Sequence, residues 1–192
     1  GYELAEEAFR KVLYYRDHPQ FVQALYHLGW CYYMQDQYEE AIAVFKYLVE
    51  EVDLDFDPSR MEDNQIVNPL LREEAIDYIA ISFDEKGRVE EALTFLKLIG
   101  NNDYASLVLK RIGELREEVL DYDNAMAMYD RLIREYPLSI GAPDAAVSSI
   151  KILETTGKTE EALRRREQFF ESYSGGSAWQ ETVAKVDSGR GR

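Results

Sequence analysis

The sequence predicts an all-α protein built from repeated helix–turn–helix units. Apolar residues make up 46% and charged residues 31% of the 192 positions, a composition that supplies a core and is typical of helical proteins. A short sequence phrase also returns along the whole chain at a nearly constant interval. We therefore expect a stack of helix pairs rather than a β-sandwich or a disordered chain.

The recurring phrase has an aromatic or small residue, two mostly acidic residues, an alanine, and an apolar residue four positions later. Its clearest copy is Tyr38-Glu39-Glu40-Ala41 followed by Phe45. The alanines of the five copies are Ala5, Ala41, Ala92, Ala125 and Ala162, at spacings of 36, 51, 33 and 37. Three of these spacings lie close to the roughly 34 residues of a helix–turn–helix repeat.

A large residue and a small residue precede the phrase at fixed offsets. Leu28 and Gly29 stand 13 and 12 positions before Ala41, and later copies have Ile79-Ala80 and Ile112-Gly113 at the same offsets. A small residue there allows a second helix to cross the first closely. The fourth copy has Ile150 at the small position and Arg166 where an aromatic residue is usual, so we expect that repeat to be degenerate.

These residues resemble the tetratricopeptide repeat family. The best copy runs from Leu28-Gly29-Trp30-Cys31-Tyr32 through Tyr38, Ala41, Phe45 and Leu48, and the third copy also keeps the closing Pro137. The resemblance covers roughly residues 2–172. It implies a right-handed superhelical stack of helix pairs that serves as a protein–protein interaction scaffold, without enzymatic activity.

The expected elements follow in order. Residues 2–15 read as the second helix of a repeat whose first helix is missing, so we expect residues 1–192 to form a single repeat domain from a longer protein. The helix pairs are expected at 20–35 with 38–51, 70–86 with 89–99, 103–119 with 122–136, and 143–156 with 159–172. Pro69 and Pro143 suit first helical positions, and Gly100 suits a helix end.

A last helix is expected at 177–186. Ser177 and Gln180 have the spacing of a capping box, in which each side chain bonds to backbone at the helix start. We expect this helix, which carries Trp179, to cap the C-terminal end of the stack.

The 51-residue spacing leaves a surplus between Glu51 and Asn68. Either it is a loop with a function or it is a solvated spacer. Residues 53–57 (DLDFD) imitate the start of a calcium loop, but Pro58 and Asn64 stand where that loop needs a glycine and a glutamate. We therefore interpret the segment as an acidic surface loop without calcium.

Several functional classes are disfavoured by composition. A net charge of −15 repels phosphate backbones, and no apolar run approaches the roughly 18 residues of a membrane span. The sequence has no glycine-rich phosphate loop, and we expect no cofactor and no metal. His27 and Cys31 share a helix face, which leaves a Cys–His hydrolase as a remote alternative. Cys31 lies within a packing segment, where a free cysteine usually acts as a small apolar residue.

The family's inward-facing offsets place a candidate binding groove on the first helices. It is aromatic at one end and acidic in the middle, which predicts a basic partner segment with an apolar anchor. The predicted partner-binding residues are Tyr26, Trp30, Tyr33, Asp77, Asp84, Glu85, Glu114, Glu117 and Glu118. Two alternatives stay open: Trp30 and Tyr33 pack against the helix at 2–15, and the carboxylates form a solvated face.

A structural spacer or self-assembly module is the alternative function. In that case the helix at 2–15 would expose an apolar edge formed by Tyr2, Phe9 and Val12, through which copies associate. A finer resemblance concerns Asp17-His18-Pro19 and Glu135-Tyr136-Pro137, which look like bacterial cell-envelope members of the family. That resemblance implies an exported scaffold of the periplasm or envelope, whose leader lies outside this sequence; the alternative location is the cytoplasm.

Overall fold

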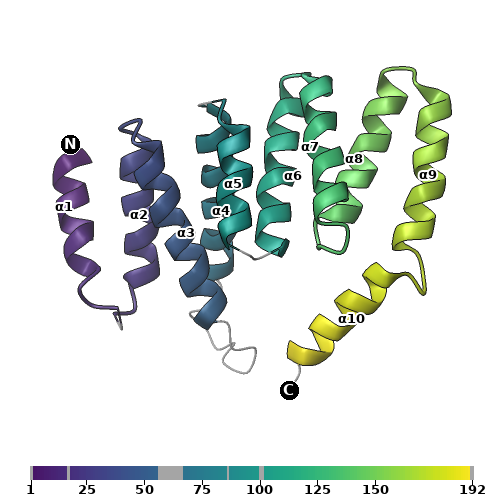
Figure 1. Ribbon diagram of the computed structural model, residues 1–192. Coiled ribbons are helices and arrows are strands. Elements are labelled where there is room, and N and C mark those ends of the chain that lie inside the picture. The colour runs from purple at the N-terminus through teal and green to yellow at the C-terminus, as the bar shows by residue number, and fades with distance from the viewer. Residues whose placement is uncertain (1, 17, 56–66, 86, 100–101, 191–192) are drawn as a thin grey trace. The chain divides into compact units, whose positions relative to one another are not determined.

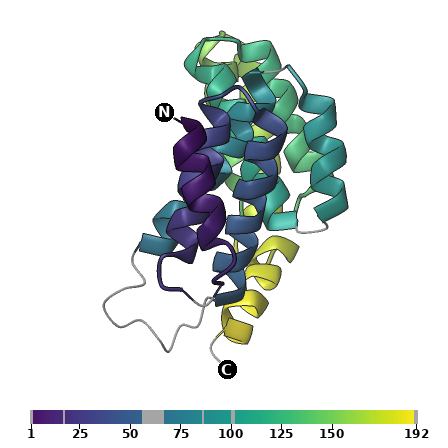
Figure 2. The same cartoon turned by 90° about the vertical axis from the view of Figure 1, so that its left-hand side faces the viewer.

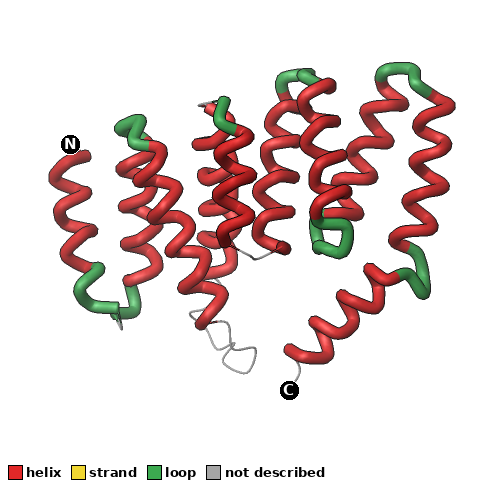
Figure 3. Tube along the Cα trace, in the orientation of Figure 1, coloured by secondary structure: helices red, strands yellow, loops and turns green. Residues whose placement is uncertain are grey.

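In the computed structural model, all regular secondary structure of the described residues is α-helix (Figures 1 and 3). The structure describes the chain except residues 1, 17, 56–66, 86, 100–101 and 191–192. The helices are α1 (Tyr2–Val12), α2 (Phe21–Tyr33), α3 (Tyr38–Asp55), α4 (Val67–Glu85), α5 (Val89–Ile99), α6 (Asn102–Glu118), α7 (Tyr122–Glu135), α8 (Ala142–Thr155), α9 (Thr159–Tyr173) and α10 (Ala178–Arg190).

The helix pairs lie where the sequence predicts them, with differences at a few ends. Helix α1 ends at Val12, and the predicted residues 13–15 lie outside it. Helix α3 extends to Asp55 and α4 begins at Val67, so both helices reach into the predicted insertion. The rest of the insertion, including Phe56, Asp57, Pro58 and Asn64 of the calcium-like run, lies outside the described residues.

The chain divides into two compact units, Gly1–Val89 and Glu90–Arg192. In unit 1, α1, α2, α3 and α4 pack in chain order, and Figure 2 shows α1 alongside α2. In unit 2, α6, α7, α8 and α9 do the same. These pairwise contacts confirm an all-α stack of helical repeats. The single-domain organisation and the handedness of a superhelix stay predictions.

The close crossing of paired helices is confirmed in two repeats. A Cβ added at Gly29 would lie 2.7 Å from the ring of Phe45, and one added at Gly113 would lie 2.5 Å from the ring of Tyr129. Both rings are fully buried. The phrase alanines are buried as the repeat register requires, at 0% exposure for Ala41, Ala92 and Ala125 and 2% for Ala162.

Consecutive repeats meet through one recurring contact. For Ala5, Ala41 and Ala125, the residue four positions after the alanine contacts the residue fourteen positions before the next phrase alanine. The ring of Phe9 stacks on His27 with centroids 5.1 Å apart, and the ring of Phe45 stacks on Tyr78 at 5.2 Å. In unit 2 the same positions hold Tyr129 and Ser148, which are hydrogen-bonded. Helix α1 therefore contacts α2 as a second helix contacts the following first helix.

The turn inside each helix pair also repeats. Two residues before the second helix, the backbone adopts a left-handed conformation, with φ of 58°, 62°, 61° and 77° at Asp36, Gly87, Leu120 and Gly157. Glycine adopts this conformation without strain, whereas an L-residue with a Cβ does not. Two of the four turns therefore hold a residue at a steric cost.

The last helix pair departs from the template, as its sequence predicts. Ile150 stands at the position of Gly29, and Arg166 stands at the position of Phe45. Arg166 forms an ion pair with Glu154 of α8 instead of filling the crossing. Of the residues of α9, Ala162 alone is buried.

Helix α10 starts with the predicted capping residues. The Gln180 N–H donates to Ser177 Oγ at 3.3 Å, and Gln180 Oε1 accepts from the Gly176 N–H at 2.7 Å. Trp179 donates from Nε1 to the Ser139 carbonyl at 2.8 Å and meets Tyr173 edge-on. Helix α10 thus packs beside Ser139 and Tyr173, whereas Leu163 and Phe170 of α9 stay exposed. That α10 covers the end of the stack stays a prediction.

Candidate functional site

Four aromatic side chains form a partly exposed cluster on the first helices of unit 1. Tyr26, Trp30 and Tyr33 come from α2, and all three meet Tyr78 of α4. Ring centroids lie 6.4 Å apart for Tyr26 and Tyr78 and 5.1 Å apart for Tyr33 and Tyr78. Trp30 donates from Nε1 to the Tyr78 hydroxyl at 2.9 Å. We call these four residues the aromatic cluster.

Sequence reasoning missed Tyr78, the centre of the aromatic cluster. The inward offsets select its neighbours on α4, whereas Tyr78 occupies the position that contacts the preceding repeat, where α2 has His27. The repeated spacing could have found it, because Tyr78 stands as far before Ala92 as His27 stands before Ala41.

The alternative that the N-terminal helix covers these rings applies to Trp30 only. Trp30 meets Tyr2 of α1 edge-on at 6.0 Å, whereas the rings that meet Tyr33 are Tyr38 and Tyr78. Each ring of the aromatic cluster keeps part of its surface accessible. The four rings therefore support one another through Tyr78, and each remains partly accessible to solvent.

Carboxylates of α4 border the aromatic cluster. Glu85 is exposed, whereas Asp77 and Asp84 are half-buried. Burial raises the pKa of Tyr33, and the Glu85 charge raises it further. Burial also raises the pKa of Tyr26, with a smaller contribution from a hydrogen bond to Glu74. A cationic side chain is attracted both by the face of an aromatic ring and by the charge of a neighbouring carboxylate.

In unit 2 the structure brings the three predicted glutamates into one cleft. Glu114, Glu117 and Glu118 lie on α6, and the cleft between α6, the start of α7 and α8 has a volume of about 570 Å³. Its other lining residues are Arg111, Leu120, Tyr122 and Ser148. We call this the α6 cleft.

The α6 cleft carries mixed charge, which corrects the expected acidic stripe in this unit. Arg111 lies 2.9 Å from Glu118 and 3.6 Å from Glu114, measured from guanidinium nitrogen to carboxylate oxygen. Lys110 Nζ also lies 3.3 Å from Glu114. Two basic residues of the same helix thus offset the glutamates. The inward offsets select Lys110 but not Arg111.

Glu117 also has a structural bond. The Tyr129 hydroxyl donates to Glu117 Oε2 at 3.0 Å across the α6–α7 crossing. Burial raises the pKa of Tyr129 above its ordinary value of 10.0, and the bond to Glu117 raises it further. A substitution at Glu117 therefore changes packing as well as surface charge.

The pair His27 and Cys31 lacks the features of a nucleophilic site. Cys31 is buried, and burial raises the pKa of its thiol, with a smaller effect from Glu6. A reactive cysteine needs a lowered pKa and access to solvent. His27 instead stacks on Phe9.

Two further features are absent from the described part of the chain. No three His, Cys, Asp or Glu side chains there are grouped as a metal site would require. None of the described helices combines the length and the apolar character that a bilayer crossing needs.

The fold is that of a helical-repeat protein, a class that includes protein–protein interaction scaffolds. Tetratricopeptide repeat family models match residues 1–56 and residues 109–139, which contain α1–α3 and the α6–α7 crossing. The chain is a tetratricopeptide repeat protein.

A curated relative was also found. The chain is 27% identical over 107 residues to ER membrane protein complex subunit 2-A of Xenopus laevis. The alignment covers 55% of this chain and 35% of that protein, so the chain matches only about a third of the relative's length.

Proposed function

We propose that the chain is a non-enzymatic scaffold subunit that binds a protein segment with basic and apolar side chains. The observation that carries this proposal is the aromatic cluster, whose partly exposed rings lie beside the carboxylates of α4. Aromatic side chains with an apolar body and a polar tip are frequent anchors in protein interfaces. The α6 cleft offers a second surface, whose charge is mixed because Arg111 and Lys110 pair with Glu114 and Glu118.

The comparisons support the coarse part of this proposal. Tetratricopeptide repeats imply protein partners, and the curated relative is by name a subunit of a protein complex. The basic and apolar character of the partner segment rests on the aromatic cluster and its charges. The cell-envelope location stays a prediction with the cytoplasm as its alternative, and the structural spacer stays the alternative function.

The two tryptophans permit a direct test. Trp30 belongs to the aromatic cluster and Trp179 to α10, so the tryptophan emission of a Trp179→Phe variant, excited selectively, reports on the cluster alone. We expect a panel of synthetic peptides with paired lysines or arginines around a leucine or phenylalanine to change that fluorescence saturably. Matched peptides with glutamate in place of the basic residues should leave it unchanged, because like charges repel.

Single substitutions distinguish the contribution of the Trp30 ring to binding from that of the Glu85 charge. Isothermal titration calorimetry measures these variants, since Trp30→Ala removes the fluorescent reporter. Trp30→Ala should weaken peptide binding by about 30-fold, whereas Trp179→Phe should bind like the wild type. Glu85→Lys should slow association at low salt, and the effect should fade as salt screens the exposed charge. Binding that tolerates both Trp30→Ala and Glu85→Lys would contradict the proposed surface, and acidic peptides that bind best would contradict the charge argument.

A further inference from the structure

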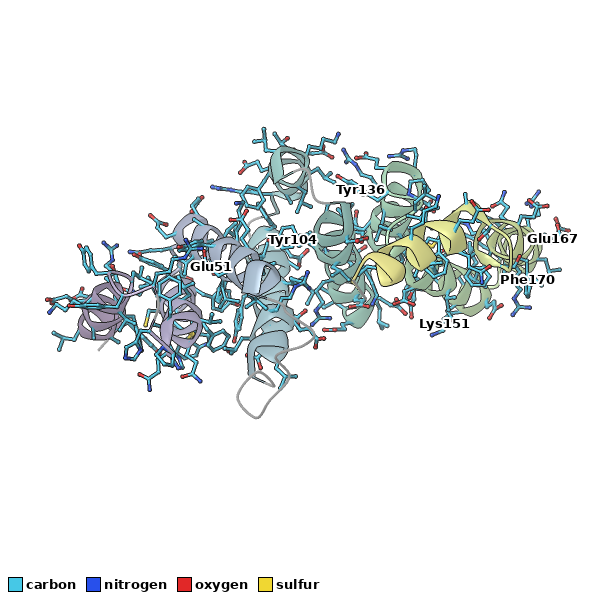
Figure 4. The ribbon with its side chains drawn as sticks, turned by 90° about the horizontal axis from the view of Figure 1, so that it is seen from below. Glu51, Tyr104, Tyr136, Lys151, Glu167 and Phe170 are labelled. Carbon is cyan, nitrogen blue, oxygen red and sulfur yellow. The ribbon has the colours of Figure 1, made fainter. Side chains whose placement is uncertain are left out.

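The outer side of α9 carries an exposed face with an ordered pattern. Leu163 and Phe170 are 52% and 65% exposed, and Arg166 and Glu167 lie between them in sequence. Spacings of three, four and seven residues place all four side chains on one side of the helix. Figure 4 shows Glu167 and Phe170 at the outer end of unit 2. We call these four residues the α9 face.

The same positions are covered elsewhere in this chain. Leu163 and Phe170 stand one and eight residues after the phrase alanine, as Ile42 and Val49 do on α3. Ile42 and Val49 are only 7% and 3% exposed, and α3 packs against α4. In this fold these positions therefore belong to a helix–helix interface.

The centre of the α9 face differs from that template. Helices α1, α3 and α7 have Phe9, Phe45 and Tyr129 four residues after the phrase alanine, and each contacts the next first helix. In α9 this position is Arg166, and Glu167 follows it. A further helix of the same kind would meet a charge where the template has a ring, so the face suits a different occupant.

We propose that the occupant is α9 of a second copy, packed antiparallel about a two-fold axis. The midpoint between Leu163 and Phe170 falls between Arg166 and Glu167. In an antiparallel pair centred there, Leu163 lies opposite Phe170 of the second copy, and Arg166 lies opposite Glu167 of the second copy. The surface is thus self-complementary in its pattern of apolar and charged residues, as a two-fold interface requires.

The existing bond of Arg166 is compatible with this arrangement. Arg166 pairs with Glu154 of its own chain, and a guanidinium has five N–H donors, so one group can contact two carboxylates. The net charge of −15 opposes association of copies, whereas α9 itself carries four glutamates and three arginines, so its own charges nearly balance. Association should therefore be measured at an ionic strength that screens the overall repulsion.

Sedimentation equilibrium of the full chain at about 0.15 M salt, from micromolar to millimolar protein, tests the interface. We expect a monomer–dimer equilibrium that Phe170→Glu weakens by about 10-fold or more, because it places a charge in an apolar contact. Leu98→Glu is the matched control: Leu98 is 83% exposed on α5 of the same unit, so the same added charge should leave the equilibrium unchanged. Circular dichroism of each variant verifies that the helices are intact.

A charge exchange tests the two-fold arrangement. Arg166→Glu and Glu167→Arg should each weaken the dimer, and the double variant should restore it, because the two positions face each other only across the axis. A wild-type chain that stays monomeric at all concentrations would overturn the proposal and leave the α9 face to a different protein. A dimer that tolerates Phe170→Glu, or a double variant that fails to restore association, would overturn it as well.

Discussion

The helix pairs α2–α3 and α8–α9 have the same spacing and turn but differ in how deeply the second helix is buried. In α2–α3, Gly29 lets the ring of Phe45 lie where a Cβ would clash, and the ring is fully buried. In α8–α9, Ile150 and Arg166 occupy those positions, and Ala162 is the one buried residue of α9. The difference teaches that the repeat length sets the order of helices, whereas the small residue and its ring set the strength of the crossing.

The largest expected effect comes from truncating the ring. Phe45→Ala removes a fully buried aromatic side chain and should lower the free energy of unfolding by about 3–5 kcal/mol. Arg166→Ala, at the same register position, removes a half-exposed ion pair and should cost less than about 1 kcal/mol. Urea unfolding followed by circular dichroism measures both. Equal losses for the two variants would break the comparison.

A smaller effect is expected from filling the crossing in unit 2. Gly113→Ala places a Cβ 2.5 Å from Tyr129 Cε1, so the ring must shift. This overpacking should cost about 1–3 kcal/mol. Gly175→Ala is the control, because its Cβ would meet only the Gln180 side chain at 3.8 Å. A neutral Gly113→Ala in thermal unfolding would show that the crossing is loose.

The Tyr129 hydroxyl allows the same crossing to be probed by pH. Tyr129→Phe removes the bond to Glu117 and should cost about 1 kcal/mol at neutral pH. The pKa of Tyr129 is raised in the folded chain, so the folded state keeps a proton that the unfolded chain releases near pH 10. The stability from this group is complete below pH 10 and is lost as the pH rises above it.

The free energy of unfolding of Tyr129→Phe should therefore fall less steeply above pH 10 than that of the wild type. The two slopes should differ by about 1.4 kcal/mol per pH unit, which corresponds to one proton. Chemical denaturation at several alkaline pH values measures that slope. An unchanged slope would mean that Tyr129 titrates with its ordinary pKa.

The smallest expected effect is a gain. Leu120 is 69% exposed and holds the left-handed conformation that Gly87 and Gly157 hold in equivalent turns. Leu120→Gly should stabilise unit 2 by about 0.5–1 kcal/mol, because it removes strain at a small cost in chain entropy. Gly157→Leu is the reciprocal variant and should destabilise by a similar amount. Thermal unfolding temperatures that move the other way would show that the strain is negligible.

The parts of the fold that depend on residue size and spacing could be predicted from the sequence. Gly113 and the phrase alanines predicted the close crossings of paired helices. Ile150 and Arg166 predicted the weaker packing of the last pair. The centre of the aromatic cluster was not predicted, because the importance of Tyr78 depends on which rings of the preceding repeat reach it. Arg111 was also missed as a partner of the α6 cleft, since the reach of a long side chain depends on its conformation and not on its offset.

Helix α1 buries none of its residues, yet Cys31 on the adjacent α2 is shielded and senses the Glu6 carboxylate. The accessibility of the Cys31 thiol thus reports on the interface between α1 and α2. We expect the opening of α1 to expose Cys31 to solvent, where a modifying reagent in excess traps the opened form. The rate of Cys31 labelling under native conditions therefore measures how often α1 separates from α2. Because Cys31 is the single cysteine of the sequence, the signal comes from this position alone.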